Sequence, residues 1–441
     1  MPAGGGLLQL VAQGKQDVFL TGNPQISFFK LVYRRYTNFA VESQAMYVDG
    51  TPNFGQRVTC LIPRRGDLLG SIYLDITLPR LTLNDGSDTP VSYVNSIGHA
   101  IIQEITFEVG EQEIDRQTGE WMELWTQLTT PASQHDALNA MIGRTYQYAP
   151  PNHIPGVSSP GLRLYIPLHF YFCRNPGLYL PLLALQYHPI RINITLAPLN
   201  TLFYKQDMVV GDNCVGQSFV NPAAITSMML WGDYVYLDVE ERRRFVSQSH
   251  EYLIEQVQYT PPMAVTAKQQ SVNIRVDFNH PIKEFIFVAQ RDIMQSVNEP
   301  FNYSNLAINE AVPAALLPYL NSGQPRTDLI STALLQLDGY DRFQVRDAPY
   351  FRLVQPYQHH TATPVTNFIY VYSIALRPED AQPTGSLNAS RIDSVNWQIT
   401  MNPQLDMPPT VSRGNCHIRV FATNNNIFRV VNGYGGLLFT I

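Results

Sequence analysis

Alternation of apolar and polar residues recurs along the whole chain and restricts the folds that it can adopt. A period of two places apolar side chains on one face of a β-strand and polar side chains on the other, as in an antiparallel sandwich. The pattern is carried by residues 72–78, 164–172, 191–196, 271–278 and 395–401. Because a proline cannot donate a backbone hydrogen bond, Pro167 predicts that its strand is an edge strand or is bulged there. The sequence therefore predicts an all-β fold.

The composition indicates a chain that hides much of its surface. Of its 441 residues, 45% are hydrophobic and only 15% are charged, against about 25% in an ordinary soluble domain. Such a chain buries its surface in β layers or against other copies of itself. The net charge of -6 argues against a protein that coats nucleic acid. The length predicts two domains or one large β unit.

Helical periodicity is confined to a few connecting segments. The first predicted helix has apolar residues at positions i, i+3, i+4 and i+7, and these are Trp121, Leu124, Trp125 and Leu128. A second helix is expected over residues 131–142, with Pro131 in its first turn, and the charged run 240–245 predicts a third. Many strands joined by few helices are typical of a sandwich or jelly roll.

The order of these segments is similar in two halves of the chain. The first half has a strand at 105–109, a helical connection, a strand ending at Phe172, a turn at 174–177 and the strand 191–196. The second half has a strand near 334–337, an irregular or helical stretch at 339–350, a strand at 368–376, a turn at 377–380 and the strand 395–401. We therefore expect an N-terminal arm over residues 1–25, a first β domain over 26–239 and a second over 240–441.

Several classes of site and of targeting signal are not indicated. The four cysteines are far apart and form no C-x-x-C motif, so neither a zinc site nor a disulfide framework is expected. The N-terminus does not resemble a signal peptide, and no apolar run approaches the ~18 residues of a membrane-spanning helix. We expect a soluble protein.

Candidate catalytic and metal-binding motifs are weak. The pair His250-Glu251 begins like a zinc-protease helix, but Ile254 stands where the second histidine ligand belongs. The pair His359-His360 favours a turn over a metal site. The arginine clusters 34–35 and 242–244 favour structural ion pairs over contacts with nucleic acid. No Gly-rich phosphate loop with its lysine and no Gly-x-Ser-x-Gly motif is present, so we expect no catalysis, no metal and no cofactor.

Three N-x-[ST] sequons occur in the sequence, at Asn193, Asn302 and Asn388. Asn193 lies in the middle of a predicted strand, whereas Asn302 and Asn388 lie in loop-like regions and are the candidate glycosylation sites. Chance occurrence is the favoured interpretation of all three.

Five blocks, spread over nearly the whole chain, resemble one protein family. They are residues 21–39 (beginning TGNPQISFFK), 172–188 (FCRNPG onward), 236–256, 351–357 (FRLVQPY) and 376–393 (beginning LRPED). In this order and at this spacing, they resemble the major capsid proteins of nucleocytoplasmic large DNA viruses. The segments 84–95, 150–160 and 296–327 match least, as variable loops would.

The resemblance implies a structural capsid protein made of two consecutive eight-stranded antiparallel jelly rolls with short helices in the connecting loops. In that family three copies form a homotrimeric capsomer of pseudo-hexagonal outline, and neighbouring capsomers tile an icosahedral shell around an internal membrane and a double-stranded DNA genome. The resemblance also implies location in the virion and assembly in the host cytoplasm. Sequence-specific binding of nucleic acid is not expected.

Two further expectations concern partners and an alternative function. The arm, with Leu7, Leu8, Leu10 and Val11, either contacts minor capsid proteins or the membrane side beneath the shell, or is a frayed terminus. The alternative function is a jelly-roll carbohydrate-binding protein, which would need a cluster of exposed Trp or Tyr in one cleft. A cupin-like enzyme is disfavoured because a credible metal triad is missing.

Overall fold

The computed structural model describes residues 4–82, 91–144, 161–205, 224–305, 327–402 and 414–440. The chain divides into an N-terminal unit, Met1–Asn38, and a larger unit, Phe39–Ile441. Two short helices of the N-terminal unit, α1 (Gly5–Val11) and α2 (Val18–Thr21), have no buried residues. The first strand begins only at Phe39, so the segment ahead of the strands continues past the expected end of the arm at residue 25.

The strands before residue 238 form two antiparallel four-stranded sheets that enclose one apolar core. The first sheet has the order β1-β10-β3-β7, with β1 Phe39–Tyr47, β10 Ser227–Leu237, β3 Leu68–Leu78 and β7 Leu162–Pro167. The second has the order β2-β8-β5-β6, with β2 Arg57–Leu61, β8 Ile190–Leu196, β5 Ile102–Val109 and β6 Gln112–Gln117. Two further strands, β4 (Val91–Tyr93) and β9 (Phe203–Lys205), pair with each other in a separate antiparallel sheet. We call this half the first roll.

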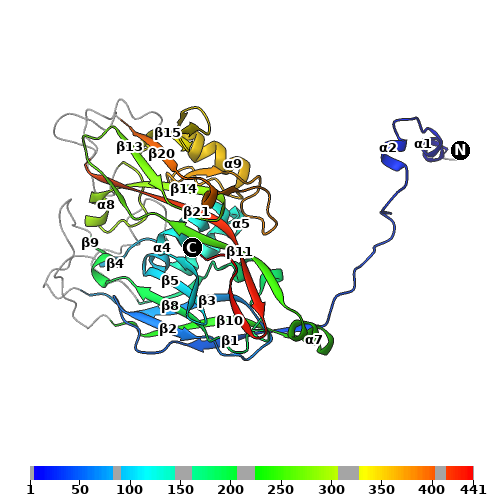
Figure 1. Ribbon diagram of the computed structural model, residues 1–441, viewed down its shortest axis with the longest axis horizontal. Coiled ribbons are helices and arrows are strands. Elements are labelled where there is room, and N and C mark those ends of the chain that lie inside the picture. The colour runs from blue at the N-terminus through cyan, green and yellow to red at the C-terminus, as the bar shows by residue number, and fades with distance from the viewer. Residues whose placement is uncertain are drawn as a thin grey trace. The chain divides into compact units, whose positions relative to one another are not determined.

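The strands after residue 249 repeat this arrangement around a second core (Figure 1). One sheet has the order β11-β21-β14-β18, with β11 His250–Tyr259, β21 Cys416–Val431, β14 Pro281–Arg291 and β18 Tyr370–Ser373. The other has the order β13-β20-β15-β16, with β13 Ser271–Val276, β20 Val395–Met401, β15 Ile330–Leu337 and β16 Tyr340–Asp341. Four short strands pair beside these paths, β12 Met263–Val265, β17 Arg346–Asp347, β19 Leu387–Asn388 and β22 Tyr434–Leu437. This half is the second roll.

The two rolls use their eight main strands in the same order along the chain. In each roll the first, third, sixth and eighth of these strands form one sheet, and the second, fourth, fifth and seventh form the other. A chain that crosses repeatedly between two facing antiparallel sheets in this way has the architecture of a jelly roll. Helix α7 (Val239–Ser247) connects the rolls, and the boundary that we propose between them, residues 239 and 240, lies at its start.

The helices of the larger unit lie in connections between strands, as the sequence predicts. The longest described ones follow β6 and are α4 (Gly119–Thr129) and α5 (Ala132–Ile142). The others are α3 (Ile97–Ala100), α6 (Tyr171–Arg174), η1 (Pro176–Leu178), η2 (Leu199–Thr201), α8 (Asp292–Ser296), η5 (Tyr350–Val354), α9 (Gln355–His359) and η6 (Ala389–Arg391). Across the residues that the structure describes, no helix combines the length and the apolar character needed to cross a bilayer.

Several predicted elements differ in extent from the observed ones, and the strand predicted over residues 368–376, for example, spans only Tyr370–Ser373. The strand predicted over residues 164–172 ends at Pro167, and residues 171–174 form α6 instead. Strand β7 is an edge strand, as Pro167 led us to expect, and the apolar residues after it are buried in the core without belonging to a sheet. Pro131 occupies the position just before α5 rather than its first turn, which is a small difference.

Candidate functional surfaces

Helix α4 of the first roll covers the outer face of one sheet of the second roll. Its four predicted apolar residues are all buried, and they pack on side chains from β11, β14, β18 and β21. These partners are Val257, Ile286, Val288, Val371 and Phe421. The rings of Trp121 and Phe421 lie 5.8 Å apart. The two rolls are thus joined by an apolar contact between a helix and a sheet.

The position of α4 depends on the residues at its beginning. Thr118 caps the helix, since its hydroxyl oxygen accepts a hydrogen bond from the backbone N–H of Trp121 at 3.1 Å. Gly119 lies against the backbone carbonyl oxygens of His99 and Ile102, and a Cβ atom here would overlap both. A glycine therefore lets the start of α4 lie directly on the end of α3 and the start of β5.

Charged side chains surround the apolar contact and are paired across it. Arg174 of the first roll forms an ion pair with Glu255 of β11, with 2.7 Å between Nη1 and Oε2, and its guanidinium stacks on the ring of Trp125. Lys283 of β14 is almost completely buried and pairs with the same Glu255 carboxylate. Its ammonium group also donates to the backbone carbonyl of Asp380 at 3.0 Å. Arg174, Glu255 and Lys283 thus each have a charged partner. Their burial at the contact between the rolls is therefore compensated by ion pairs and hydrogen bonds.

Asp115 of β6 is a second polar link between the rolls. Its carboxylate accepts hydrogen bonds from the backbone N–H of Val257 at 3.1 Å and from the amide of Gln117 at 2.8 Å. Burial raises the pKa of Asp115 to about 6, although these hydrogen bonds act in the opposite direction. Asp115 of the first roll is therefore hydrogen-bonded directly to the backbone of β11 in the second roll.

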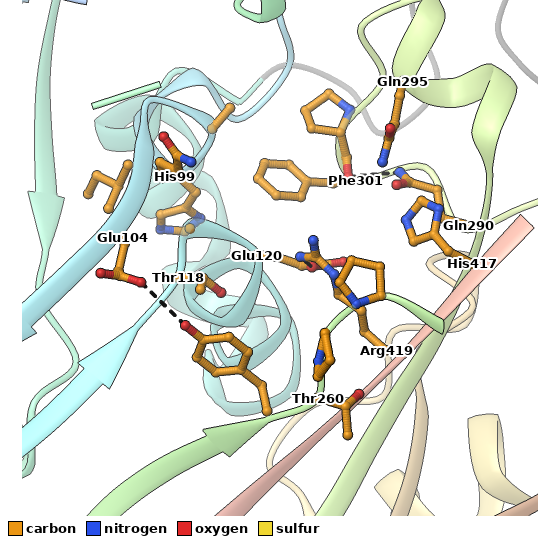
Figure 2. A pocket seen from close by; sticks show the side chains of 18 of the residues that line it. His99, Glu104, Thr118, Glu120, Thr260, Gln290, Gln295, Phe301, His417 and Arg419 are labelled. Carbon is orange, nitrogen blue, oxygen red and sulfur yellow. Dashed lines mark hydrogen bonds and ion pairs between the residues drawn. The ribbon is translucent and has the colours of Figure 1, made fainter. Parts of the chain in front are cut away.

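A cavity of about 450 Å³ lies between the two rolls. Figure 2 shows His99 and Glu104 of the first roll on one side and Gln290 and His417 of the second roll on the other. Arg419, which extends into the space between them, is ion-paired with Glu120 at the beginning of α4.

One histidine that lines this cavity belongs to a buried chain of ion pairs behind it. His99 is fully buried, and its Nδ1 lies 2.7 Å from Oε2 of Glu123, whose other oxygen lies 2.8 Å from Arg144. The lining contains three threonines and neither serine nor cysteine. The described residues include no group of three or more His, Cys, Asp or Glu placed to hold a metal ion.

The histidine motifs singled out in the sequence have structural contacts. His250 donates from Nε2 to the backbone carbonyl of Phe245 at 2.8 Å, and His359 donates from Nδ1 to the carbonyl of Leu376 at 3.0 Å. His360 lies at the end of α9 with its side chain fully buried between two carboxylates, 2.8 Å from Glu284 and 2.9 Å from Glu379. Burial lowers the pKa of His360, but the two carboxylates outweigh burial and raise it to about 9.

The cysteines and the second arginine cluster also have structural roles. Burial raises the pKa of the Cys60 and Cys173 thiols to about 12, which leaves them unreactive. Cys214 lies outside the described residues. Arg242 is paired with Asp67 at 2.8 Å and Arg243 with Glu240 at 3.2 Å, as predicted for this cluster. The Arg34-Arg35 pair is exposed in the N-terminal unit.

The three sequons differ in accessibility. Asn193 is buried in β8, where its side chain accepts from Thr59 at 2.8 Å and donates to Thr106 at 3.3 Å. The amide nitrogen of Asn302 donates to Glu299 at 2.5 Å, and its oxygen accepts two hydrogen bonds from Ser304. Asn388 is exposed, and its oxygen accepts from the backbone N–H of Ser390 at 3.1 Å.

One sheet face of the first roll carries a group of aromatic residues that are exposed or half-buried. Cross-strand neighbours on the outer face of β1-β10-β3-β7 form the row Tyr47, Met229, Asp75, Tyr165 and the adjacent row Ala45, Trp231, Tyr73, Pro167. Tyr47 is 71% exposed, whereas Trp231, Tyr73, Tyr165 and Met229 are half-buried. We call the set Tyr47, Tyr73, Tyr165, Met229 and Trp231 the aromatic face. The other three tryptophans are buried.

Two family models match consecutive parts of the chain. Residues 27–238 match "Major capsid protein N-terminus", and residues 241–436 match "Large eukaryotic DNA virus major capsid protein". The chain is 39% identical to the major capsid protein of Pyramimonas orientalis virus, over 99% of this chain and 100% of that protein. It is 36% identical to the major capsid protein of Paramecium bursaria Chlorella virus 1, over 99% of both chains.

Solved structures show the same architecture. The PBCV-1 VP54 structure fitted into a reconstruction of the virophage Sputnik matches with a TM-score of 0.74 and 30% identity, over 94% of this chain and 100% of that chain. The Faustovirus major capsid protein also has a TM-score of 0.74, at 12% identity and over 95% and 94% of the two chains, and supports the fold alone. The predicted fold of two consecutive jelly rolls is confirmed, and both relatives and fold are those of structural capsid proteins rather than enzymes. The chain belongs to the family of major capsid proteins of large eukaryotic DNA viruses.

Proposed function

We propose that this chain assembles as a homotrimer whose six rolls give a pseudo-hexagonal capsomer, and that such capsomers tile an icosahedral shell. The observation that supports this proposal most strongly is the repetition of one roll within the chain, with the same strand order in both halves. Two similar rolls in each of three copies supply six similar walls around a threefold axis. Closed cyclic symmetry is the usual form of a homo-oligomer.

The composition and the exposed surface support a function based on contacts between copies. Only 15% of the residues are charged, and the centres of large obligate interfaces are depleted of charge. The aromatic face places the exposed Tyr47 and four half-buried large side chains beside the ion pair of Arg163 and Asp75, a mixed surface that is suited to contacts with another copy. In a shell, each capsomer is held by several neighbours at once, so that individually weak contacts add up.

We propose that the N-terminal unit binds minor capsid proteins beneath the shell, close to an internal membrane. Its helices and the segment that follows them expose many large apolar side chains, among them Phe19, Phe28 and Phe29, each at least 88% exposed. Residues 1–38 carry four basic residues and one acidic residue, Lys15, Lys30, Arg34, Arg35 and Asp17, while the whole chain has a net charge of -6. Apolar, basic segments of this kind suit acidic partners. Deleting residues 1–38 should leave the purified trimer intact but prevent complete shells from forming in infected cells.

The mass of the purified protein in solution tests the trimer. Light scattering coupled to size exclusion should give three times the chain mass of 49.9 kDa. A stable monomer that is retained on glycan resins would contradict the proposal and support the carbohydrate-binding alternative, with the aromatic face as its sugar platform.

We propose that assembly takes place in the host cytoplasm, outside the secretory pathway, and that the sequons occur by chance. Asn193 and Asn302 have their amide groups engaged in hydrogen bonds. Asn388 is open to a glycosyltransferase, so it is the informative position. Peptide mass spectrometry of purified virions should find Asn388 unmodified, and an N-linked glycan there would contradict assembly outside the secretory pathway.

A further inference from the structure

Asp115 of β6 differs from its charged neighbours at the contact between the two rolls. Arg174, Glu255 and Lys283 are ion-paired with one another. Asp115 is only 4% exposed, yet no lysine, arginine or histidine of the described residues forms an ion pair with it. A buried carboxylate without a counterion costs free energy to ionise.

The hydrogen bonds of the Asp115 carboxylate come from neutral groups, which are the backbone N–H groups of Val257 and Arg116 and the side-chain amide of Gln117. These donors offset only part of the cost of burying the charge, since burial raises the pKa of Asp115 to about 6 in their presence. The protonated acid retains an oxygen that can accept the N–H of Val257. Uptake of a proton therefore removes the buried charge and leaves the first roll linked to β11.

The ionisable side chains around Asp115 lie on α6, in the segment before α6, on β11 and on β6 itself. They are His169, Tyr171, Arg174, Glu255, Glu113 and Arg116. Burial lowers the pKa of His169 to about 3 and raises that of Tyr171 well above 10, so both side chains are neutral between pH 5 and pH 8. The two arginines are ion-paired with the two glutamates. Among the shifted pKa values of this set, that of Asp115 alone lies between 5 and 8.

We propose that Asp115 makes the contact between β6 and β11 sensitive to pH, so that the two rolls are attached more stably when its carboxyl is protonated and separate more readily when it is ionised. This inference does not depend on the proposed trimer, because Asp115 and β11 belong to the same chain. A capsid subunit with this contact is more stable in acidic solution than at neutral pH.

The direction of the effect follows from the shift of one pKa. Folding raises the pKa of Asp115 from 3.8 to about 6. The stability that the protonated carboxyl contributes is therefore complete below pH 3.8 and is lost as the pH rises through 6. With these two pKa values, the equilibrium constant for opening the contact should increase about tenfold between pH 5 and pH 8.

Hydrogen exchange of β11 in the full chain tests the proposal, because it reports how often this strand opens. Asp115→Asn removes the ionisation and keeps an oxygen that can accept the N–H of Val257. Wild type and variant are compared at the same pH, since the exchange chemistry itself depends on pH. The ratio of the wild-type rate to the variant rate in β11 should rise about tenfold from pH 5 to pH 8.

Asp277→Asn is the matched control, because the Asp277 side chain is 78% exposed and is paired with Arg275 at the surface. Its ratio to the wild type should be the same at both pH values. If Asp115→Asn does not fold, Gln117→Met replaces it. This variant removes one donor to the carboxylate, so its β11 should exchange faster than that of the wild type, and by a larger factor at pH 8 than at pH 5. A ratio for the Asp115 or Gln117 variant that does not change between the two pH values would overturn the proposal.

Discussion

His360 shows how a single side chain can fasten a surface loop of the second roll. Its imidazolium lies between Glu284 on β14 and Glu379 in the loop after β18. The Glu379 carboxylate also accepts hydrogen bonds from the backbone N–H and the hydroxyl of Thr361. A buried positive charge between two carboxylates favours the protonated histidine, whereas a neutral imidazole could donate to only one of them.

The contribution of His360 to stability should be lost in alkaline solution. The pKa of His360 rises from 6.5 to about 9 on folding. The protonated side chain therefore contributes its full stabilisation of the folded protein below pH 6.5, and this contribution is lost as the pH rises through 9. Thermal melts of the wild type and of His360→Gln should therefore differ most near pH 6 and converge near pH 10. A difference in melting temperature that is the same at both pH values would refute this role of His360.

Trp397 is the largest buried side chain of the second core, and its ring contacts those of Phe285, Phe287 and Phe351. Trp397→Ala should lower the free energy of unfolding by about 3–5 kcal/mol, because the surrounding rings cannot fill the cavity completely. Chemical denaturation measures this loss. Replacing the exposed Tyr340 by Ala is the control and should change stability by less than about 0.5 kcal/mol. A loss for Trp397→Ala as small as that of the control would show that Trp397 does not hold this core together.

At the scale of elements, α4 is one of the parts of the first roll that attach the second roll. Its apolar face covers a sheet of the second roll, and its first turn lies on α3 and β5. The helix therefore belongs to the packing of both rolls, and a displacement of α4 would be transmitted to the junction.

Gly119→Ala should destabilise the protein by about 1–3 kcal/mol, although alanine is a better helix former than glycine. The added Cβ atom would overlap the carbonyl oxygens of His99 and Ile102 and push α4 away from them. Gly5→Ala in α1 is the matched control, because its Cβ atom would meet no atom within 4 Å. Thermal melts compare the two variants, and a melting temperature of Gly119→Ala at or above that of the wild type would contradict the close approach.

The sequence predicted elements whose pattern is local and missed features that depend on distant residues. The four apolar residues of α4 are buried as their spacing indicated, since helical periodicity reports one buried face. The strand through Pro167 was predicted too long because buried apolar residues after it continue the alternation without pairing. The pairing of His360 with Glu284 and Glu379 was missed altogether, because nothing in local spacing connects residues so far apart along the chain.

At the scale of the whole molecule, the two rolls are equivalent in their strand order. The sequence already indicated two similar halves, and the structure gives both the same order of strands and a helical connection at the same place. The aromatic face could not be identified from the sequence, because alternation alone does not tell whether the outer face of a sheet is covered by a helix or open to solvent.

Electron microscopy of the purified protein tests this equivalence most directly. Class averages should show a ring of six lobes with threefold symmetry, in which lobes of two slightly different shapes alternate. Two-lobed particles that remain separate at every concentration, or rings with another number of lobes, would contradict the account.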